Sequence, residues 1–380
     1  MSSLELIKRL VEFNTVSRDS NLPLIDFISE YLDGLGIRSY RVESDDGKKS
    51  NLYASVGPEE IGGVVLSGHT DVVPTDGQDW HTDPFGPEVK DQKLFGRGTC
   101  DMKGFIGTAL ALIPEMDALR KPIHFALSYD EEVGCKGAPS MIREISERLP
   151  RPEAVIVGEP STMKAITGHK GMVTLSTSVH GLEAHSSQTH RGVSAVMTAA
   201  TLVEKLNSMA AELSDNTSRD TGFEPRHSTI HVGVIRGGTA INIISRHCEF
   251  FWDIRCIPDD NPQAIIDEFE KYCQDEILPN MLRISDKCSV STKTMASAPA
   301  FLMSESPAMA LLSSLGIDEA DRYAPYVAEA GQFQTAGFPT VICGPGSIDQ
   351  AHKPNEFIEL NQIEEGEALL RRLIKRLSDQ

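Results

Sequence analysis

The stretch GGVVLSGHTDVVP (62–74) contains a short apolar run that is followed at once by His69 and Asp71. Short runs rich in β-branched residues are typical of strands buried on both faces, as in a parallel sheet. Three further runs have this character and alternate along the chain with helical patterns: IHFALS (123–128), AVIVG (154–158) and PTVICG (339–344). The alternation predicts an α/β fold, with a mostly parallel sheet and helices on both of its faces.

The middle of the chain follows a different pattern. Three segments alternate apolar and polar residues, which indicates a sheet with one face in water, and helical patterns separate them. These strands are expected at 172–181, 228–238 and 247–257, and the helices at 193–213 and 262–278. We therefore expect an inserted α+β domain at 172–285, between two parts of the α/β domain at 1–171 and 286–380.

Length, charge and cysteine content exclude several classes of protein. The 380 residues suffice for two domains, and a formal net charge of −19 disfavours binding to nucleic-acid phosphates. No apolar run approaches the ~20 residues that span a bilayer, and the N-terminal segment lacks the apolar core of a signal peptide. The seven cysteines are odd in number and show no C-x-x-C spacing, which suits a reducing compartment. We expect a cytoplasmic protein without nucleic-acid or membrane partners.

Acidic and histidine side chains follow the predicted strands at the points where they end, and one further acid lies in a glycine-rich turn. Ligands bind at the carboxyl ends of the strands in an open α/β sheet, so these side chains are expected at one edge. A single acidic or histidine residue after a strand is usually an ordinary loop residue. That explanation would require several coincidences when such residues follow several strands at the same topological position. Clustered carboxylates also repel one another without a cation. A mixed set of nitrogen and oxygen ligands suits Zn(II) or a similar ion, and five ligands with one shared carboxylate suit two ions. The candidates are His69, Asp101, Asp130, Glu131, Glu132, Glu159 and His352.

The adjacent pair Glu131–Glu132 suggests a division of roles. Neighbours in an extended chain point to opposite faces, so one can bind metal while the other accepts a proton from water. A metal-activated water beside a carboxylate is suited to hydrolysing an amide. Asp71 lies two residues after His69, and its carboxylate is expected to accept a hydrogen bond from the imidazole N–H.

Five motifs together resemble those of the dizinc aminoacylase/carboxypeptidase family and occur in its order: HTDVVP (69–74), GRGTCDMKG (96–104), DEEVG (130–134), GEPS (158–161) and GPGSIDQAHKPNE (344–356). The resemblance implies a hydrolase that cleaves the amide of an N-acyl amino acid. N2-acetyl-L-ornithine, in arginine biosynthesis, is the expected substrate. N-succinyl-diaminopimelate and a broader range of N-acyl amino acids or dipeptides are the alternatives. The implied cofactors are two divalent metal ions, Zn(II) or Co(II).

The resemblance also assigns a role to each site residue. It implies that Asp101 bridges the two ions, that Glu131 is the general base, and that Asp71 orients His69. The remaining metal ligands are then His69 and Glu159 on one ion, and Glu132 and His352 on the other.

The inserted segment resembles the lid and dimerisation domain of that family. HGLEAHSSQTHRGVSA (180–195) contains His185, which the resemblance implies reaches into the active site of a partner chain and stabilises the oxyanion. Asn242 in GGTAINIIS and Arg255 in FWDIRC are implied to lie near the substrate carboxylate. A homodimer is therefore expected.

Two other classes of function compete with this interpretation. A non-catalytic metal-binding protein on the same fold would not need an additional base at Glu131. A thiol hydrolase would use Cys100, but the negative charge of the adjacent Asp101 disfavours a thiolate there.

Overall fold

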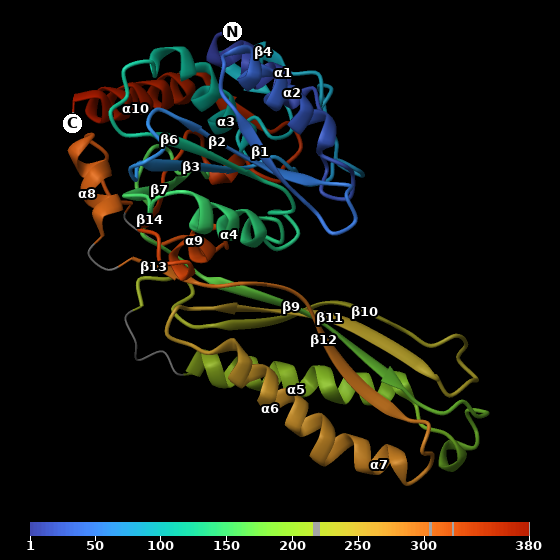
Figure 1. The fold of residues 1–380 in the computed structure, drawn as a ribbon. Coiled ribbons are helices and arrows are strands. Elements are labelled where there is room, and N and C mark those ends of the chain that lie inside the picture. Colours follow the sequence, from blue (N-terminus) through green and yellow to red (C-terminus); the bar gives the residue numbers. More distant parts are fainter. Residues whose placement is uncertain (216–220, 304–305, 321–322, 380) are drawn as a thin grey trace. The chain divides into compact units, whose positions relative to one another are not determined.

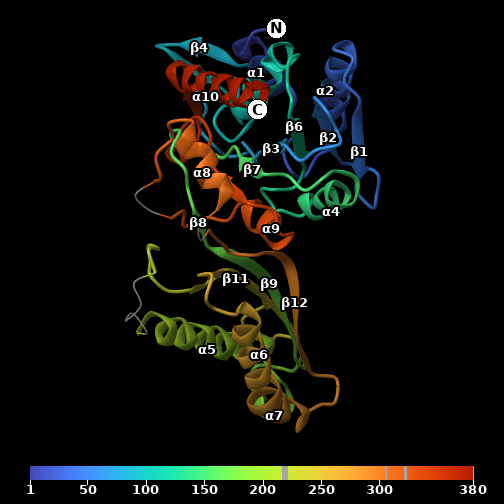
Figure 2. The ribbon, with the colours of Figure 1, turned by 60° about the vertical axis from the view of Figure 1, so that its left-hand side comes forward.

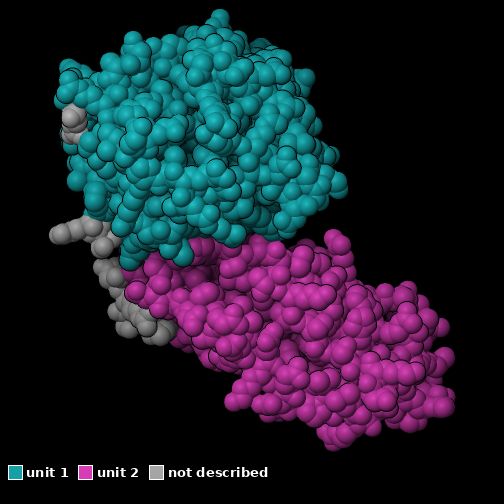
Figure 3. Space-filling view, viewed as in Figure 1, with its two compact units in different colours: residues 1–168, 301–323, 328–380 teal, residues 169–300, 324–327 magenta. Residues whose placement is uncertain are grey.

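The computed structural model describes residues 1–215, 221–303, 306–320 and 323–379. The chain divides into two compact units, which Figure 3 shows in different colours. Unit 1 consists of residues 1–168, 301–323 and 328–380, and unit 2 of residues 169–300 and 324–327. Unit 2 is thus an insertion into the chain of unit 1.

Unit 1 is built on a six-stranded sheet with the strand order β1-β2-β6-β3-β7-β14. Strands β6, β3, β7 and β14 run parallel, and they are the four apolar runs from which the fold was predicted. Strands β2 and β1 extend the sheet through two antiparallel pairings, β2 with β6 and β1 with β2, and the apolar runs do not predict them. The strands are Ser39–Glu43 (β1), Ser50–Val56 (β2), Val64–His69 (β3), Ile123–Ser128 (β6), Ala154–Val157 (β7) and Thr340–Ile342 (β14). The predicted α/β fold is confirmed.

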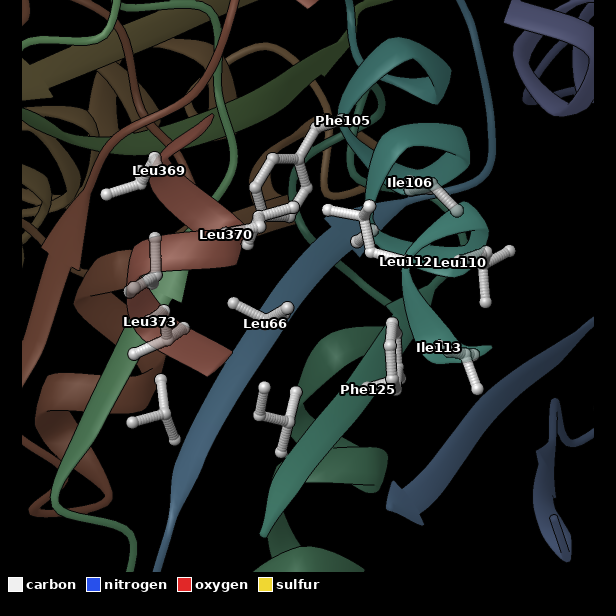
Figure 4. Packing of buried hydrophobic residues seen from close by; sticks show 14 of the residues in the cluster. Leu66, Phe105, Ile106, Leu110, Leu112, Ile113, Phe125, Leu369, Leu370 and Leu373 are labelled. Carbon is white, nitrogen blue, oxygen red and sulfur yellow. The ribbon is translucent and has the colours of Figure 1, made fainter. Parts of the chain in front are cut away.

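Helices cover both faces of this sheet (Figures 1 and 2). Side chains of a strand alternate between the two faces, so Phe125 of β6 enters the cluster that includes Phe105 of α3 and Leu370 of α10 (Figure 4). Each such buried side chain contributes about 1.5–3 kcal/mol to stability. Within the described residues, no helix has the length and apolar character needed to cross a bilayer. The helices of unit 1 are Ser3–Val11 (α1), Leu22–Gly34 (α2), Lys103–Ala111 (α3), Ala138–Arg148 (α4), Pro307–Ser314 (α8), Ala330–Thr335 (α9) and Leu360–Asp379 (α10).

A small three-stranded sheet joins distant parts of unit 1. Its order is β15-β5-β4, and all of its pairings are antiparallel. Phe357 pairs with Phe95, which places the preceding Glu356 beside the glycine-rich turn that begins at Gly96. The end of the GPGSIDQAHKPNE motif therefore meets the turn that carries Asp101. The strands are Glu88–Lys90 (β4), Lys93–Phe95 (β5) and Phe357–Glu359 (β15), and a separate short pair is formed by Gly168–His169 (β8) and Phe301–Leu302 (β13).

Unit 2 contains an antiparallel sheet in the order β10-β11-β9-β12, with helices on one face (Figure 1). Alternate residues of β11 are buried, as the alternating sequence pattern predicted. Trp252 of this strand packs against Phe269, with the ring centroids 5.1 Å apart. The elements are Gly171–His180 (β9), Thr229–Gly237 (β10), His247–Cys256 (β11), Ser289–Ala298 (β12), Ala195–Asp215 (α5), Pro262–Tyr272 (α6) and Leu278–Leu282 (α7).

The observed unit boundaries differ from the predicted ones. Strand β12 pairs with β9 from Ser289 opposite His180 to Ala298 opposite Met172, so residues 286–300 lie in unit 2 rather than in the catalytic domain. The sequence of β12, SVSTKTMASA, is mostly polar and gives no strong strand signal. The first boundary falls after residue 168 instead of 171, because β9 begins at Gly171 and its preceding residues already cluster with unit 2.

Candidate metal centre

The carboxyl ends of the parallel strands carry the predicted ligands at one edge of the unit 1 sheet. His69 is the last residue of β3 and pairs with Ser128, the last residue of β6. Asp130 follows in a left-handed conformation (φ 56°), which turns the chain into Glu131 and Glu132. Its own carboxylate forms an ion pair with Lys49 and does not join the ligand cluster.

Four ligand side chains lie around Asp101, which is the fifth ligand. Nε2 of His69 lies 3.0 Å from Oδ1 of Asp101 and 3.9 Å from Oε1 of Glu159. Nε2 of His352 lies 3.3 Å from Oδ2 of Asp101 and 3.0 Å from Oε2 of Glu132. The two oxygens of Asp101 therefore face different histidines, and each histidine is close to one glutamate. This is the grouping that the resemblance implied for two ions that share Asp101.

The charges of the cluster fit a pair of cations. Burial, with the nearby charge of Asp101, raises the pKa of Glu132 to about 7 and the pKa of Glu159 to about 8. Burial opposes ionisation of Asp101 too, but hydrogen bonds with His352 and His69 hold its pKa below the usual range. Hydrogen bonds with Asp101 and Glu132 raise the pKa of His352 to about 10. The carboxylates thus draw protons onto the imidazoles, and divalent cations in this nitrogen and oxygen donor set would neutralise the same negative charge.

Asp71 contacts a different group from the one predicted. Its carboxylate Oδ1 is 3.8 Å from Nδ1 of His69, which is too far for a hydrogen bond. Nδ1 of His69 instead lies 2.9 Å from the main-chain carbonyl oxygen of Asp71, to which its N–H donates. The carboxylate accepts hydrogen bonds from the amides of Glu131 (3.1 Å) and Glu132 (3.3 Å) and from the hydroxyl of Ser17 (2.6 Å). The predicted carboxylate–imidazole contact is wrong, because the main chain of Asp71 holds His69 while its side chain holds the glutamate turn.

Glu131 and Glu132 occupy different positions, as expected for one base and one ligand. Glu132 is the member of the pair beside His352, whereas Oε1 of Glu131 accepts a hydrogen bond from the thiol of Cys135 at 3.3 Å. Burial raises the pKa of Glu131 well above its ordinary value. A raised pKa suits a carboxylate that takes a proton from water and later gives it up.

Cys100 does not have the environment of a nucleophile. Burial and the charges of Glu356 and Asp101 raise the pKa of its thiol well above the ordinary value. The thiol donates to the carbonyl oxygen of Ser347 at 3.2 Å. This environment opposes the thiolate that a thiol hydrolase would need.

The other three predicted residues lie in unit 2. His185 is exposed and pairs through its main chain with Ile243, which places it beside Asn242. Arg255 lies near the other end of β11 and donates through Nε to Oδ2 of Asp253 at 2.9 Å. Unit 2 thus keeps His185 and Asn242 together and holds Arg255 separately.

Four buried side chains near the cluster were not among the predicted site residues. Glu356 and Ser17 bind the turns that carry the ligands, Cys135 contacts Glu131, and Glu329 accepts a hydrogen bond from Ser67 on β3 at 3.2 Å. Glu356 closes a motif that was already recognised, so its position in the motif was an available signal. Ser17 lies 54 residues before its partner Asp71, and no local pattern indicates the pairing.

A protein-family model described as "Peptidase family M20/M25/M40" matches residues 65–376 of this chain. That range contains Asp101 and the four ligands around it. The chain belongs to the M20 peptidase family. Among curated relatives, the acetylornithine deacetylase of Pasteurella multocida (strain Pm70) is 31% identical, covering 98% of this chain and 97% of that protein. The acetylornithine deacetylase of Myxococcus xanthus is 32% identical, covering 97% and 95%.

Solved structures of M20 proteins share the fold. The metallo-carboxypeptidase of this family from Sulfolobus solfataricus has a TM-score of 0.78 at 15% identity, with 100% of both chains covered. Human carnosine dipeptidase 1 has a TM-score of 0.74 at 18% identity, with 100% of this chain and 97% of that chain covered. The protein described here is accordingly a metal-dependent hydrolase of the M20 family.

Proposed function

We propose that this M20 hydrolase converts N2-acetyl-L-ornithine to L-ornithine and acetate. The observation that carries the proposal is the grouping of four ligands around the Asp101 carboxylate, with a separate buried base at Glu131. The substrate is proposed because relatives named acetylornithine deacetylase match over nearly the whole length of the chain. Arginine biosynthesis is the proposed setting. The proposed cofactors are two Zn(II) ions, for which Co(II) can substitute.

The chain's own residues supply the remaining chemistry. When bound, the two cations would supply the positive charge that favours ionisation of water and stabilises charge on the amide oxygen. Glu131 receives the proton from the attacking water and passes it to the leaving amine. Arg255 presents a planar guanidinium with two parallel N–H groups, which suits the α-carboxylate of an amino acid.

A second copy of the chain is proposed to complete the site. Arg255 pairs with Met172 near one end of β11, whereas the strand begins at His247, next to the segments of His185 and Asn242. At about 3.3 Å per residue, the eight steps from His247 to Arg255 span roughly 25 Å. One small amino acid cannot contact Arg255 and His185 of the same chain, so His185 and Asn242 would come from the partner chain.

The surface of unit 2 offers a place for that partner. Strand β10 is at the edge of the sheet, so its outer N–H and C=O groups are available for pairing. Exposed apolar side chains lie on it and on neighbouring segments, and such patches favour protein contacts. They are Val196, Met197, Val234, Ile235, Ile241 and Ile243. A homodimer joined through unit 2 is therefore proposed.

The compartment is proposed to be the cytoplasm. All seven cysteines are free and buried, so the fold does not depend on disulfides. Free thiols persist in a reducing compartment.

The proposal is tested by assaying the purified full-length protein against N2-acetyl-L-ornithine and N-succinyl-L,L-diaminopimelate side by side. Exhaustively chelated protein should be inactive, and Zn(II) or Co(II) should restore release of acetate from N2-acetyl-L-ornithine. Metal-loaded Glu131→Gln serves as the control for contaminating hydrolases. Faster turnover of the succinyl substrate would replace the proposed substrate, and full activity of verified metal-free protein would overturn the metal requirement.

A further inference from the structure

The carboxylate of Glu356 accepts hydrogen bonds from main-chain amides of the turn that carries Asp101. Glu356 is 1% exposed. Oε2 accepts a hydrogen bond from the amide of Gly98 at 3.0 Å. Oε1 accepts from the amides of Cys100 at 2.9 Å and Asp101 at 3.1 Å. Three amides of one short turn thus point at a single anion, and the last of them belongs to the residue that faces both histidines.

Backbone geometry allows this convergence. Gly98 adopts φ 85°, a left-handed conformation, and an added Cβ would lie 2.8 Å from Cγ1 of Val72. A residue with a side chain would be strained there, so glycine lets the turn fold its amides inward. Successive amides in such a turn form a concave site for a negative group. In this protein the negative group is Glu356 rather than a ligand from solution.

A buried cation balances the Glu356 carboxylate. Nη1 of Arg97 lies 2.6 Å from Oε2 of Glu356, and Arg97 is 1% exposed. The guanidinium carbon lies 5.2 Å from the centre of the Trp80 ring. A buried carboxylate that is paired and fully hydrogen-bonded is tolerated, whereas an unpaired one is costly. Arg97 and the three amides therefore hold the Glu356 carboxylate in a fixed orientation.

The same network reaches His352. Nη2 of Arg97 donates to Oε1 of Gln78 at 2.7 Å, and Nε2 of Gln78 donates to the main-chain oxygen of His352 at 2.9 Å. His352 has φ 63°, a left-handed conformation that is uncommon for residues other than glycine. Glu356, Arg97 and Gln78 thus connect the main chains of Asp101 and His352 without contacting either side chain.

We propose that Glu356 is a positioning residue, which, with Arg97 and Gln78, sets the distance and orientation of Asp101 and His352 for binding two cations. The inference rests on the metal centre of the proposed function. The proposal predicts that a variant without the Glu356 carboxylate binds metal ions more weakly. Glu356→Gln keeps the volume of the side chain but places an amide N–H₂ against main-chain N–H groups, so the turn loses acceptors and Asp101 loses its fixed position. Partners that orient ligands typically contribute 10–100-fold to metal affinity.

The test measures Co(II) binding to chelated full-length protein by calorimetry and by the visible absorption of the bound ions, without any substrate. Glu356→Gln should bind Co(II) about 10–100-fold more weakly and with an altered absorption spectrum. Glu115→Gln is the matched control, because it removes an exposed ion pair with Arg371 in the same unit. The control should bind Co(II) like the unchanged protein.

A second variant and the measurement of folding decide the outcomes that Glu356→Gln alone would leave open. If Glu356→Gln does not fold, Gln78→Ala tests the His352 branch at a half-buried position and should weaken binding in the same direction. Unchanged affinity and spectrum in a folded variant, even one with a lower melting temperature, would reduce Glu356 to a purely structural role and overturn the inference. Because no substrate is used, failure to hydrolyse N2-acetyl-L-ornithine would leave this result intact. Failure of the unchanged protein to bind two ions would instead remove the metal centre itself.

Discussion

Replacing Asp71 by asparagine separates two interpretations of that residue. If its carboxylate holds the glutamate turn, Asp71→Asn should disturb Glu131 and Glu132 and spare His69, whose Nδ1 bonds to the main-chain oxygen of residue 71. If instead the carboxylate orients the imidazole, the same change should weaken binding of the cation beside His69.

The expected size follows from the acceptors. Oδ2 of Asp71 accepts from Ser17 and Glu132, and Oδ1 accepts from Glu131. Asparagine keeps one oxygen, so its best orientation retains the two bonds of Oδ2 and places an N–H₂ against the amide of Glu131. Hydrogen bonds to charged groups contribute about 1.5–3 kcal/mol, which predicts a fall in kcat of roughly 10–150-fold. Ser17→Ala leaves the carboxylate and its bonds to both glutamate amides in place, so it should lower kcat less than Asp71→Asn does.

The decisive assay uses a background with a single ion site. His352→Ala removes the ligand beside Glu132 and leaves His69, Glu159 and Asp101. In this background Asp71→Asn should leave the dissociation constant of the remaining Zn(II) unchanged within about twofold, as measured by competition with a chromophoric chelator. A tenfold weaker Zn(II) complex in the double variant would refute the reasoning and return the carboxylate to His69.

Three further predictions follow from the site and its surroundings. Glu131→Gln should lower kcat by about 10²–10⁴-fold with normal metal content, whereas Glu132→Gln should lose metal; the reverse result, by elemental analysis, would exchange their roles. Mixed dimers refolded from His185→Ala and Glu131→Gln should regain one active site for each heterodimer, and inactive heterodimers would exclude a role of His185 in the partner's site. Burial lowers the pKa of His124 from its ordinary value of 6.5 to about 4. The unfolded chain therefore binds the proton first as the pH falls, and stability present above pH 6.5 is lost toward pH 4. Urea unfolding, followed in a variant that keeps Trp80 as its only tryptophan, should show that His124→Gln loses about 2–3 kcal/mol less than the parent between pH 7.5 and 4.5; equal losses would contradict the assignment.

The parts that could be predicted from the sequence are those with local or topological signals. Apolar runs marked the four parallel strands, and the rule that ligands gather at the carboxyl ends of strands placed His69 and Glu159 correctly. The contacts that hold the ligands in place, by contrast, join residues that lie far apart in the chain. Glu356 bonds to an amide 255 residues away, and no periodicity records such a pairing. The polar edge strand β12 was misplaced for the same reason, since only its pairing with β9 reveals it as part of unit 2.

Because unit 2 is inserted into the chain of unit 1, a ribosome synthesises all of unit 2 before it reaches the last strand of the unit 1 sheet. Strand β7 ends at Val157, but its neighbour β14 begins at Thr340, and a ribosome at about 5–20 residues per second needs roughly 10–40 s to cover that interval. During this time the nascent chain carries the outer edge of β7 without its partner strand, and the core lacks Leu370 and Leu373 of α10. Unpaired apolar edges are sites of aggregation, so this interval is the time at which a chaperone would be needed. His352 also emerges only after the whole of unit 2, so an incomplete chain lacks a ligand for the second ion and is not yet a hydrolase.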